Sequence, residues 1–181
     1  MFGYVPVAIE DVASIKRGKR VVRNELEDEG AYPVFQNSMT PLGYYGESNC
    51  PPNTAFVIAA GAAGEIGYSN SAFWAADDCY YFECSDVLMS RYLYYVLQNM
   101  HQYIISRVRK ASVPRLSKTV LEKMTIPIPE ISEQARIVSI LDRFDTICND
   151  LTNGLPAEIE ARRKQYEYYR DKLLTFKEKT A

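Results

Sequence analysis

The sequence lacks several features that would point to a catalytic or membrane protein. It has one histidine, one tryptophan and four cysteines among 181 residues, and no CxxC pair. No apolar run of about 18 residues occurs, so we expect no membrane-spanning helix. The beginning of the chain has no basic segment followed by an apolar core, so we expect no secretion signal. Lys and Arg total 21 against 23 Asp and Glu, so any affinity for nucleic acid must come from local basic patches.

The cysteines predict free thiols rather than a metal site. Cys79 and Cys84 lie in an expected strand with an odd offset, which puts their side chains on opposite faces. His101 lies in an expected helix with no cysteine near it in the sequence, so we expect no zinc or other metal. Mostly buried free thiols indicate a reducing compartment, and we expect a cytoplasmic protein.

The remaining composition is that of a globular protein of the α+β class. Hydrophobic residues make up 47% of the chain and charged residues 24%, which is enough apolar material for one core. We expect a mixed-sheet domain over residues 1–129 and a helical region over residues 130–181. Segments rich in β-branched and aromatic residues predict strands at 32–36, 54–60, 66–69 and 79–83. Helical patterns are expected at 8–15, from the Ser85-Asp86 cap to 104, and at 117–124.

The helical region has a repeated apolar stripe. Ser132 suits an N-cap, and the positions that follow recur at spacings of three and four residues. They are Ile137, Leu141, Phe144, Cys148, Leu151 and Leu155, and then Arg162, Tyr166, Tyr169, Leu173 and Phe176. A repeat of about 3.5 residues is typical of a coiled-coil seam.

The stripe is interrupted at Asn153-Gly154-Leu155-Pro156. Either one helix is kinked there, or Pro156 begins a second helix at its first position. We favour one kinked helix, because Leu155 and Arg162 stay in the same heptad phase. Such a helix over residues 133–176 would be about 65 Å long and would need a partner, most simply a second copy. The expected dimer interface is Ile137, Leu141, Phe144, Leu151, Tyr166, Tyr169 and Leu173. The alternative is a hairpin that folds back at Gly154 within one chain.

Two basic clusters stand out from the acidic background. The first is the run from Lys16 to Arg20 with Arg23, where Gly18 predicts a loop. The second comprises Arg107, Arg109, Lys110, Arg115 and Lys118. Each run alone is typical of a solvated face, but both together indicate nucleic acid, because Arg and Lys bind phosphates while Gln and Asn read base edges. The predicted DNA-binding residues are Lys16, Arg17, Lys19, Arg20, Arg23, Gln36, Asn37, Tyr44, Tyr45, Arg107, Arg109 and Lys110.

Three segments resemble catalytic motifs but depart from them in spacing or residue type. The glycines of residues 61–67 lack GxGxxG spacing. Cys50-Pro51-Pro52-Asn53 departs from the (Asp/Asn)-Pro-Pro-aromatic motif of amino-methyltransferases at its first and last positions. The pair Asp77-Asp78 has no lysine close behind it, which a common type of nuclease needs. We therefore predict no catalytic residue and no independent enzyme.

Several segments together resemble the specificity (S) subunits of type I restriction-modification systems. The most specific are the Ile126-Pro127-Ile128-Pro129 string with Glu133-Gln134, and the Gln165–Arg170 string. The other matching segments are 12–20, 32–35, 43–45, 60–64, 73–79 and 154–164. Together they span most of the chain.

The resemblance implies a DNA-recognition role. S subunits of this family usually carry two target-recognition domains, each followed by a conserved helix, and the two helices pair antiparallel. Each domain reads one half of a bipartite DNA sequence. Two modification subunits, which bind S-adenosylmethionine, dock on this scaffold and methylate adenine at N6. Restriction subunits add cleavage that depends on ATP and Mg²⁺. The S subunit itself is expected to bind no cofactor.

The chain differs from these S subunits in being half as long, with one expected recognition domain and one helix. It is a natural half-subunit, a truncated gene product or a piece of a longer chain. An antiparallel homodimer, or pairing with another S-subunit half, would supply the second recognition domain. The homodimer would read an interrupted palindrome with half-sites on the order of 10 bp apart. The alternatives are a coiled-coil interaction module with incidental basic loops, an autonomous DNA enzyme, and an inactive S-subunit fragment without DNA specificity.

Overall fold

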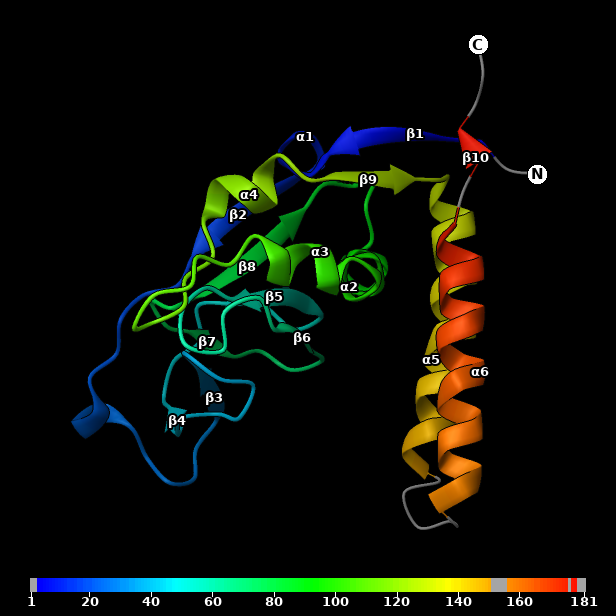
Figure 1. The fold of residues 1–181 in the computed structure, drawn as a ribbon. Coiled ribbons are helices and arrows are strands. Elements are labelled where there is room, and N and C mark those ends of the chain that lie inside the picture. The colour runs from blue at the N-terminus through cyan, green and yellow to red at the C-terminus, as the bar shows by residue number, and fades with distance from the viewer. Residues whose placement is uncertain (1–2, 151–155, 176, 179–181) are drawn as a thin grey trace.

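The computed structural model describes residues 3–150, 156–175 and 177–178. A body of strands and short helices stands beside a pair of long helices (Figure 1). The expected α+β class with a long C-terminal helix is confirmed. Within the described ranges, no helix is both long and apolar enough to cross a membrane.

The body is built on a four-stranded antiparallel sheet in the order β2-β8-β5-β6. Its strands are β2 (Ala13–Arg17), β5 (Thr54–Ile58), β6 (Ile66–Ser69) and β8 (Cys79–Cys84). All of β5 is buried, because both faces of this strand are covered. The strands expected at 54–60, 66–69 and 79–83 are confirmed. The helix expected over 8–15 is only one turn, α1 (Ile9–Val12), because alternating burial makes the next residues a strand.

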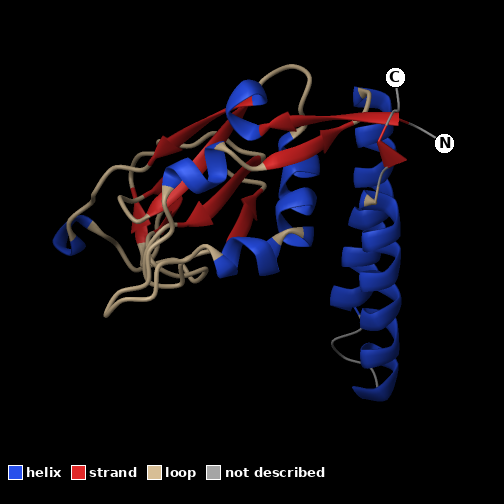
Figure 2. Cartoon of the chain, turned by 45° about the horizontal axis from the view of Figure 1, so that its top comes forward, coloured by secondary structure: helices blue, strands red, loops and turns tan. Residues whose placement is uncertain are grey.

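Two smaller three-stranded sheets flank the central sheet (Figure 2). One joins β1 (Gly3–Ala8) to β9 (Thr125–Ile128) and β10 (Lys177–Glu178). The other joins β3 (Tyr32–Phe35), β4 (Tyr44–Tyr45) and β7 (Trp74–Ala75), and so confirms the strand expected at 32–36. The change from sheet to helix lies between Ile128 and Ile131, while β10 returns to β1. The division into residues 1–129 and 130–181 stays a prediction.

The helices form a layer and a hairpin. They are α2 (Ser90–Asn99), α3 (His101–Ser106), α4 (Lys118–Glu122), α5 (Ile131–Asp150) and α6 (Pro156–Leu174), with a short 3-10 helix, η1 (Arg23–Glu25), in the first basic loop. Helix α2 packs on β5 and β6 on one side and on α5 and α6 on the other. It begins at Ser90 rather than at the expected Ser85-Asp86 cap, because residues 85–88 form a turn closed by the N–H of Leu88 to the carbonyl of Ser85. Ser132 lies inside α5 and does not cap it.

The hydrophobic core lies mainly between the central sheet and α2, and it extends to Ile137, Leu141 and Leu174 of the two long helices. A smaller cluster covers the opposite face of the sheet and contains Cys79. Cys84 packs against the main core, so the two thiols face opposite sides as expected. Among the described residues, no group of His, Cys, Asp or Glu is arranged to hold a metal ion.

The two long helices form a hairpin, which corrects the expected single kinked helix over 133–176. Helices α5 and α6 lie side by side (Figure 1), and the rings of Phe144 and Tyr169 stack with centroids 5.6 Å apart. Pro156 begins α6 at the position where a missing N–H costs nothing. The hairpin is thus the alternative that the sequence left open.

Because of the hairpin, most of the predicted dimer-interface residues that the structure describes pack within the chain. Ile137 and Leu141 are 0% exposed within the chain, and Leu173 and Tyr166 are half-buried against the same core. Phe144 contacts both Tyr166 and Tyr169 of α6. Leu151 lies outside the described residues. The described part of the apolar stripe therefore packs mainly within the same chain, and most of it is not available to a second copy.

Candidate nucleic-acid interface

The first basic cluster begins inside a strand rather than in the expected loop. Lys16 and Arg17 end β2, and the loop starts at Gly18. A Cβ atom at Gly18 would lie 2.2 Å from the carbonyl oxygen of Ala76, so only glycine allows this close approach. The N–H of Lys19 donates to the carbonyl of Ala75 at 2.9 Å. The main chain from Lys16 to Lys19 is therefore held in place by its strand pairing and by these contacts.

The cations of this cluster have different surroundings. Lys16 Nζ lies 3.6 Å from a carboxylate oxygen of Glu83, and Arg17 Nε donates to the carbonyl of Asp77 at 2.7 Å. Arg20 and Arg23 are exposed, and within the described residues neither lies within ion-pair distance of an acid. Lys19 is exposed, and its carbonyl accepts the indole N–H of Trp74 at 2.8 Å.

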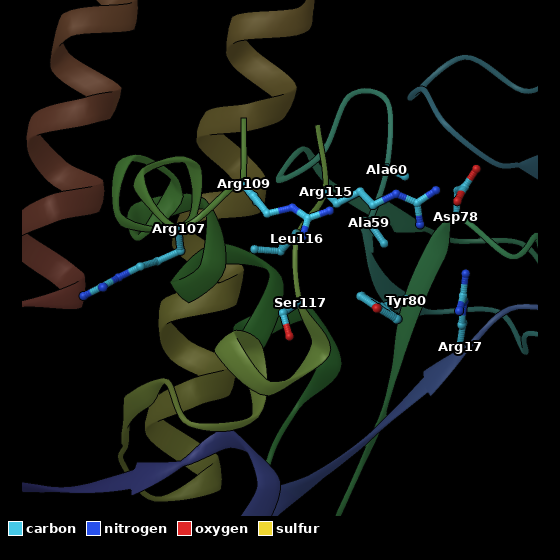
Figure 3. Close-up of a pocket in the computed structure, with 10 residues that line it drawn as sticks. All are labelled: Arg17, Ala59, Ala60, Asp78, Tyr80, Arg107, Arg109, Arg115, Leu116 and Ser117. Atoms are coloured by element: carbon cyan, nitrogen blue, oxygen red, sulfur yellow. The ribbon is translucent and has the colours of Figure 1, made fainter. Parts of the chain in front are cut away.

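The two basic clusters meet at one pocket of about 310 Å³ (Figure 3). Arg17 reaches it from the first cluster, and Arg107, Arg109 and Arg115 reach it from the second. The other lining residues are Ala59, Ala60, Asp78, Tyr80, Leu116 and Ser117. The side chain of Arg107 extends away from the others, and its guanidinium lies 4.9 Å from the centre of the Tyr103 ring. The pocket therefore concentrates positive charge in a chain of net charge −2.

The loop that carries the second cluster is fixed by main-chain hydrogen bonds. The N–H groups of Arg109 and Arg115 donate to each other's carbonyls, at 2.8 and 3.1 Å. The N–H of Leu116 donates to the carbonyl of Ala59 at 2.8 Å, which ties the loop to the end of β5. The arginine side chains thus leave from a positioned main chain, which lowers the entropy lost on binding an anion.

The predicted base-reading residues lie on a neighbouring loop. The carbonyl of Asn37 accepts the N–H of Ala62 at 2.9 Å, and the N–H of Gly61 donates to the carbonyl of Pro114 at 3.3 Å. Gly61 has φ +83°, and a Cβ there would lie 2.7 Å from the Asn37 carbonyl oxygen. Asn37 therefore lies beside the loops that form the arginine pocket, with half-buried Gln36 next to it.

The remaining predicted residues do not line the pocket. Tyr45 packs edge-on against Trp74 with ring centroids 4.9 Å apart, and half-buried Tyr44 pairs with Pro33 in the same small sheet. Lys110 is exposed beside Arg109. Arg115 and Tyr80 do line the pocket, although the predicted set omits them. The signal for Tyr80 is its register with Arg17 across β2 and β8, which the sequence alone does not show.

The family model of the type I restriction modification DNA specificity domain matches residues 1–161 of the chain. The chain belongs to this family. The EcoR124I/EcoR124II specificity subunit of Escherichia coli is 45% identical over 91 residues, which cover 49% of this chain and 22% of that subunit. The MpnII specificity subunit of Mycoplasma pneumoniae is 29% identical over 173 residues, which cover 93% of this chain and 52% of that subunit. The match thus covers about half the length of the MpnII subunit and less than a quarter of the EcoR124I/EcoR124II subunit.

Solved structures share the fold. The S subunit of a type I restriction-modification system from M. genitalium matches with a TM-score of 0.76 and 21% identity, over 84% of this chain and 41% of that one. The HsdS subunit from Thermoanaerobacter tengcongensis matches with a TM-score of 0.66 and 20% identity, over 95% of this chain and 45% of that one. These matches confirm that the chain has the fold of part of a specificity subunit.

Proposed function

We propose that this chain is the DNA-recognition part of a type I restriction-modification complex and reads one half of a bipartite DNA sequence. The observation that carries the proposal is the pocket where Arg17, Arg109 and Arg115 converge from two distant segments. Arginine binds phosphate oxygens and the guanine edge, so the same pocket suits both positioning and reading of a duplex. Asn37, on the adjoining loop, supplies an amide of the kind that pairs with adenine.

A bipartite target needs two recognition domains, and the described residues form one. An antiparallel homodimer or another S-subunit half supplies the second, and the homodimer reads an interrupted palindrome. Because Ile137 and Leu141 are buried within the chain, the contact uses exposed side chains of the hairpin. Ile147 and Tyr168, which are 42% and 61% exposed, are apolar side chains available for this contact.

The chain acts as a non-catalytic scaffold in this proposal. Modification subunits that bind S-adenosylmethionine methylate adenine at N6, and restriction subunits use ATP and Mg²⁺ to cleave, while this chain binds no cofactor. The outer face of α6 carries exposed ion pairs within the helix, such as Lys164 with Glu160 at 3.0 Å. Exposed charges of both signs are suited to orienting a docking subunit.

The experiment that tests the proposal measures duplex binding by the chain with its modification subunit at several salt concentrations. The logarithm of the wild-type binding constant should fall linearly with the logarithm of the salt concentration. The size of this slope should decrease by about one in Arg109→Ala and in Arg115→Ala, because each variant loses one phosphate contact. Arg136→Ala is the matched control, since Arg136 pairs with Glu133 on the surface of α5. Salt-independent binding, or slopes unchanged in both pocket variants, would instead favour an interaction module with incidental basic loops.

A further inference from the structure

Arg91, on helix α2, contacts three layers of the molecule at once. Its guanidinium carbon lies 4.6 Å from the ring centre of Tyr68, which belongs to β6 of the central sheet. It lies 5.0 Å from the ring centres of both Tyr94 and Tyr95 on its own helix. Its Nε and Nη2 atoms both lie 2.8 Å from Oδ1 of Asp142 on α5. One planar, mostly buried cation therefore joins the sheet, α2 and α5.

Tyr95 strengthens this junction. Its hydroxyl lies 2.6 Å from Asp142 Oδ1 and 2.8 Å from Asp145 Oδ2, and it accepts a hydrogen bond from Arg91 at 3.1 Å. Burial, followed by the hydrogen bonds to the two aspartates, raises the pKa of Tyr95 well above its usual range. The hydroxyl therefore keeps its single proton, which is shared between the two carboxylates of α5.

A second junction lies further back along α5. The side chain of Gln134 is fully buried, and its amide donates to the carbonyls of Val87 and Pro129 while its oxygen accepts the N–H of Met89. Gln134 precedes Asp142 by about 12 Å along the helix axis at 1.5 Å per residue. Two separated polar junctions, together with the buried Ile137 and Leu141 between them, fix the direction of this helix relative to α2.

We propose that Arg91 is a positioning residue that sets the angle between the recognition domain and the helical hairpin, and through that angle the spacer length between DNA half-sites. The proposal rests on the proposed bipartite recognition. The Gln134 junction acts as the pivot. The junction of Arg91 and Tyr95 with Asp142 and Asp145, here called the latch, fixes the rotation about it. Lysine cannot replace Arg91 fully, because an ammonium lacks the planar surface that lies against the three tyrosine rings.

The angle is tested on the full chain by spin labels and pulsed dipolar spectroscopy. Labels are introduced as unnatural amino acids at exposed Ser14 of β2 and exposed Arg143 of α5, so the native cysteines are not involved. Wild type should give one narrow distance distribution, and Arg91→Met should widen it at least twofold. Arg91→Lys should give an intermediate width. Arg136→Met, in an exposed ion pair of the same helix, should keep the wild-type width.

Arg91→Met leaves Asp142 and Asp145 without their cation and could fail to fold. Tyr95→Phe is therefore the second variant. It keeps the buried ring and removes only the hydroxyl between Asp142 and Asp145. It should also widen the distribution, and its circular dichroism should match wild type. A wild-type width in a folded latch variant overturns the proposal, since a residue that serves only stability would not change the angle of folded molecules.

The spacer is tested by mapping methylated adenines in cells that express each variant with the modification subunit. Wild type should modify sites of one spacer length, and the latch variants should keep the same half-site bases but also modify sites with the spacer changed by about one base pair. A widened angle with one unchanged spacer overturns the proposal. If wild type modifies no interrupted site, the proposed function fails, and the distance distributions then decide the role of Arg91 alone.

Discussion

The main chains of Arg109 and Arg115 hydrogen-bond to each other in both directions, so two arginine side chains leave from directly opposite positions. Like charges placed opposite each other in such a pair destabilise the fold. Both arginines line the pocket. Among the described residues, no acidic side chain lies within ion-pair distance of either one. This arrangement lowers the stability of the fold and concentrates positive charge in the pocket, a combination that is common at binding sites.

This relationship predicts opposite effects on folding and binding. Arg115→Gln should leave the melting temperature unchanged or slightly higher, because it removes a repulsion, while weakening duplex binding about uniformly across sequences. Thermal unfolding and fluorescence anisotropy with several duplexes measure the two effects. A clear loss of stability together with unchanged binding would assign Arg115 to the fold instead.

Gly18 should tolerate no side chain. In Gly18→Ala the new Cβ would meet the main chain of Ala75 and Ala76, so the end of β2 must shift and Arg17 must move with it. We expect a loss of about 1–3 kcal/mol in the free energy of unfolding, together with weaker DNA binding. Gly46→Ala is the matched control, since nothing lies within 4 Å of its Cβ. Equal stability of the two variants by chemical denaturation would contradict the close approach.

Leu141 should matter for folding rather than for dimerisation. A charge at a seam position would be expected to give folded monomers if the seam faced a second copy, but Leu141 is 0% exposed within the chain. Leu141→Ala should therefore cost about 2–5 kcal/mol, and Leu141→Asp should prevent stable folding. Ile131→Ala, at the first position of α5 and 48% exposed, serves as control. A folded monomeric Leu141→Asp protein with wild-type stability would show that the seam is intermolecular.

The described thiols should be slow to react. Burial raises the pKa of Cys50 to about 12 and that of Cys84 to about 11, and it also raises that of the deeply buried Cys79. A rise from 9.0 to about 11 leaves about 100-fold less thiolate at neutral pH. In a Cys148→Ser chain, labelling by a disulfide reagent should be at least about 100-fold slower in the folded state than after unfolding. Fast labelling of the folded chain would contradict this burial.

The strands and the family could be predicted from the sequence because their signals are local. The content of β-branched and aromatic residues places β5, β6 and β8 correctly, and Cys79 and Cys84 take opposite faces as the period of two requires. The strand β2 was missed because its segment also fits one helical turn, and only pairing with β8 decides between the two.

The hairpin and the pocket depend on contacts between distant segments. The stripe that contains Phe144 has the same spacing whether its partner is Tyr169 of the same chain or a second copy, so the heptad phase cannot distinguish the two. Charge alone marks Lys16 and Arg17 equally, yet strand pairing gives Lys16 the neighbour Glu83 and leads Arg17 to the pocket. Which cations are available is therefore a property of the tertiary structure.

The central claim, DNA recognition by this half-length chain, is tested most directly by its methylation pattern. The chain is co-expressed with its modification subunit in a host that lacks DNA methylation, and modified adenines are mapped across the genome. If the homodimer recognises DNA through this pocket, modification should occur at an interrupted palindrome. This modification should be lost, or its sequence specificity relaxed, when Arg17, Arg109 and Arg115 are replaced together. Absence of modification while the complex demonstrably forms would contradict the central claim, and modification at a site with two unrelated halves would contradict the homodimer.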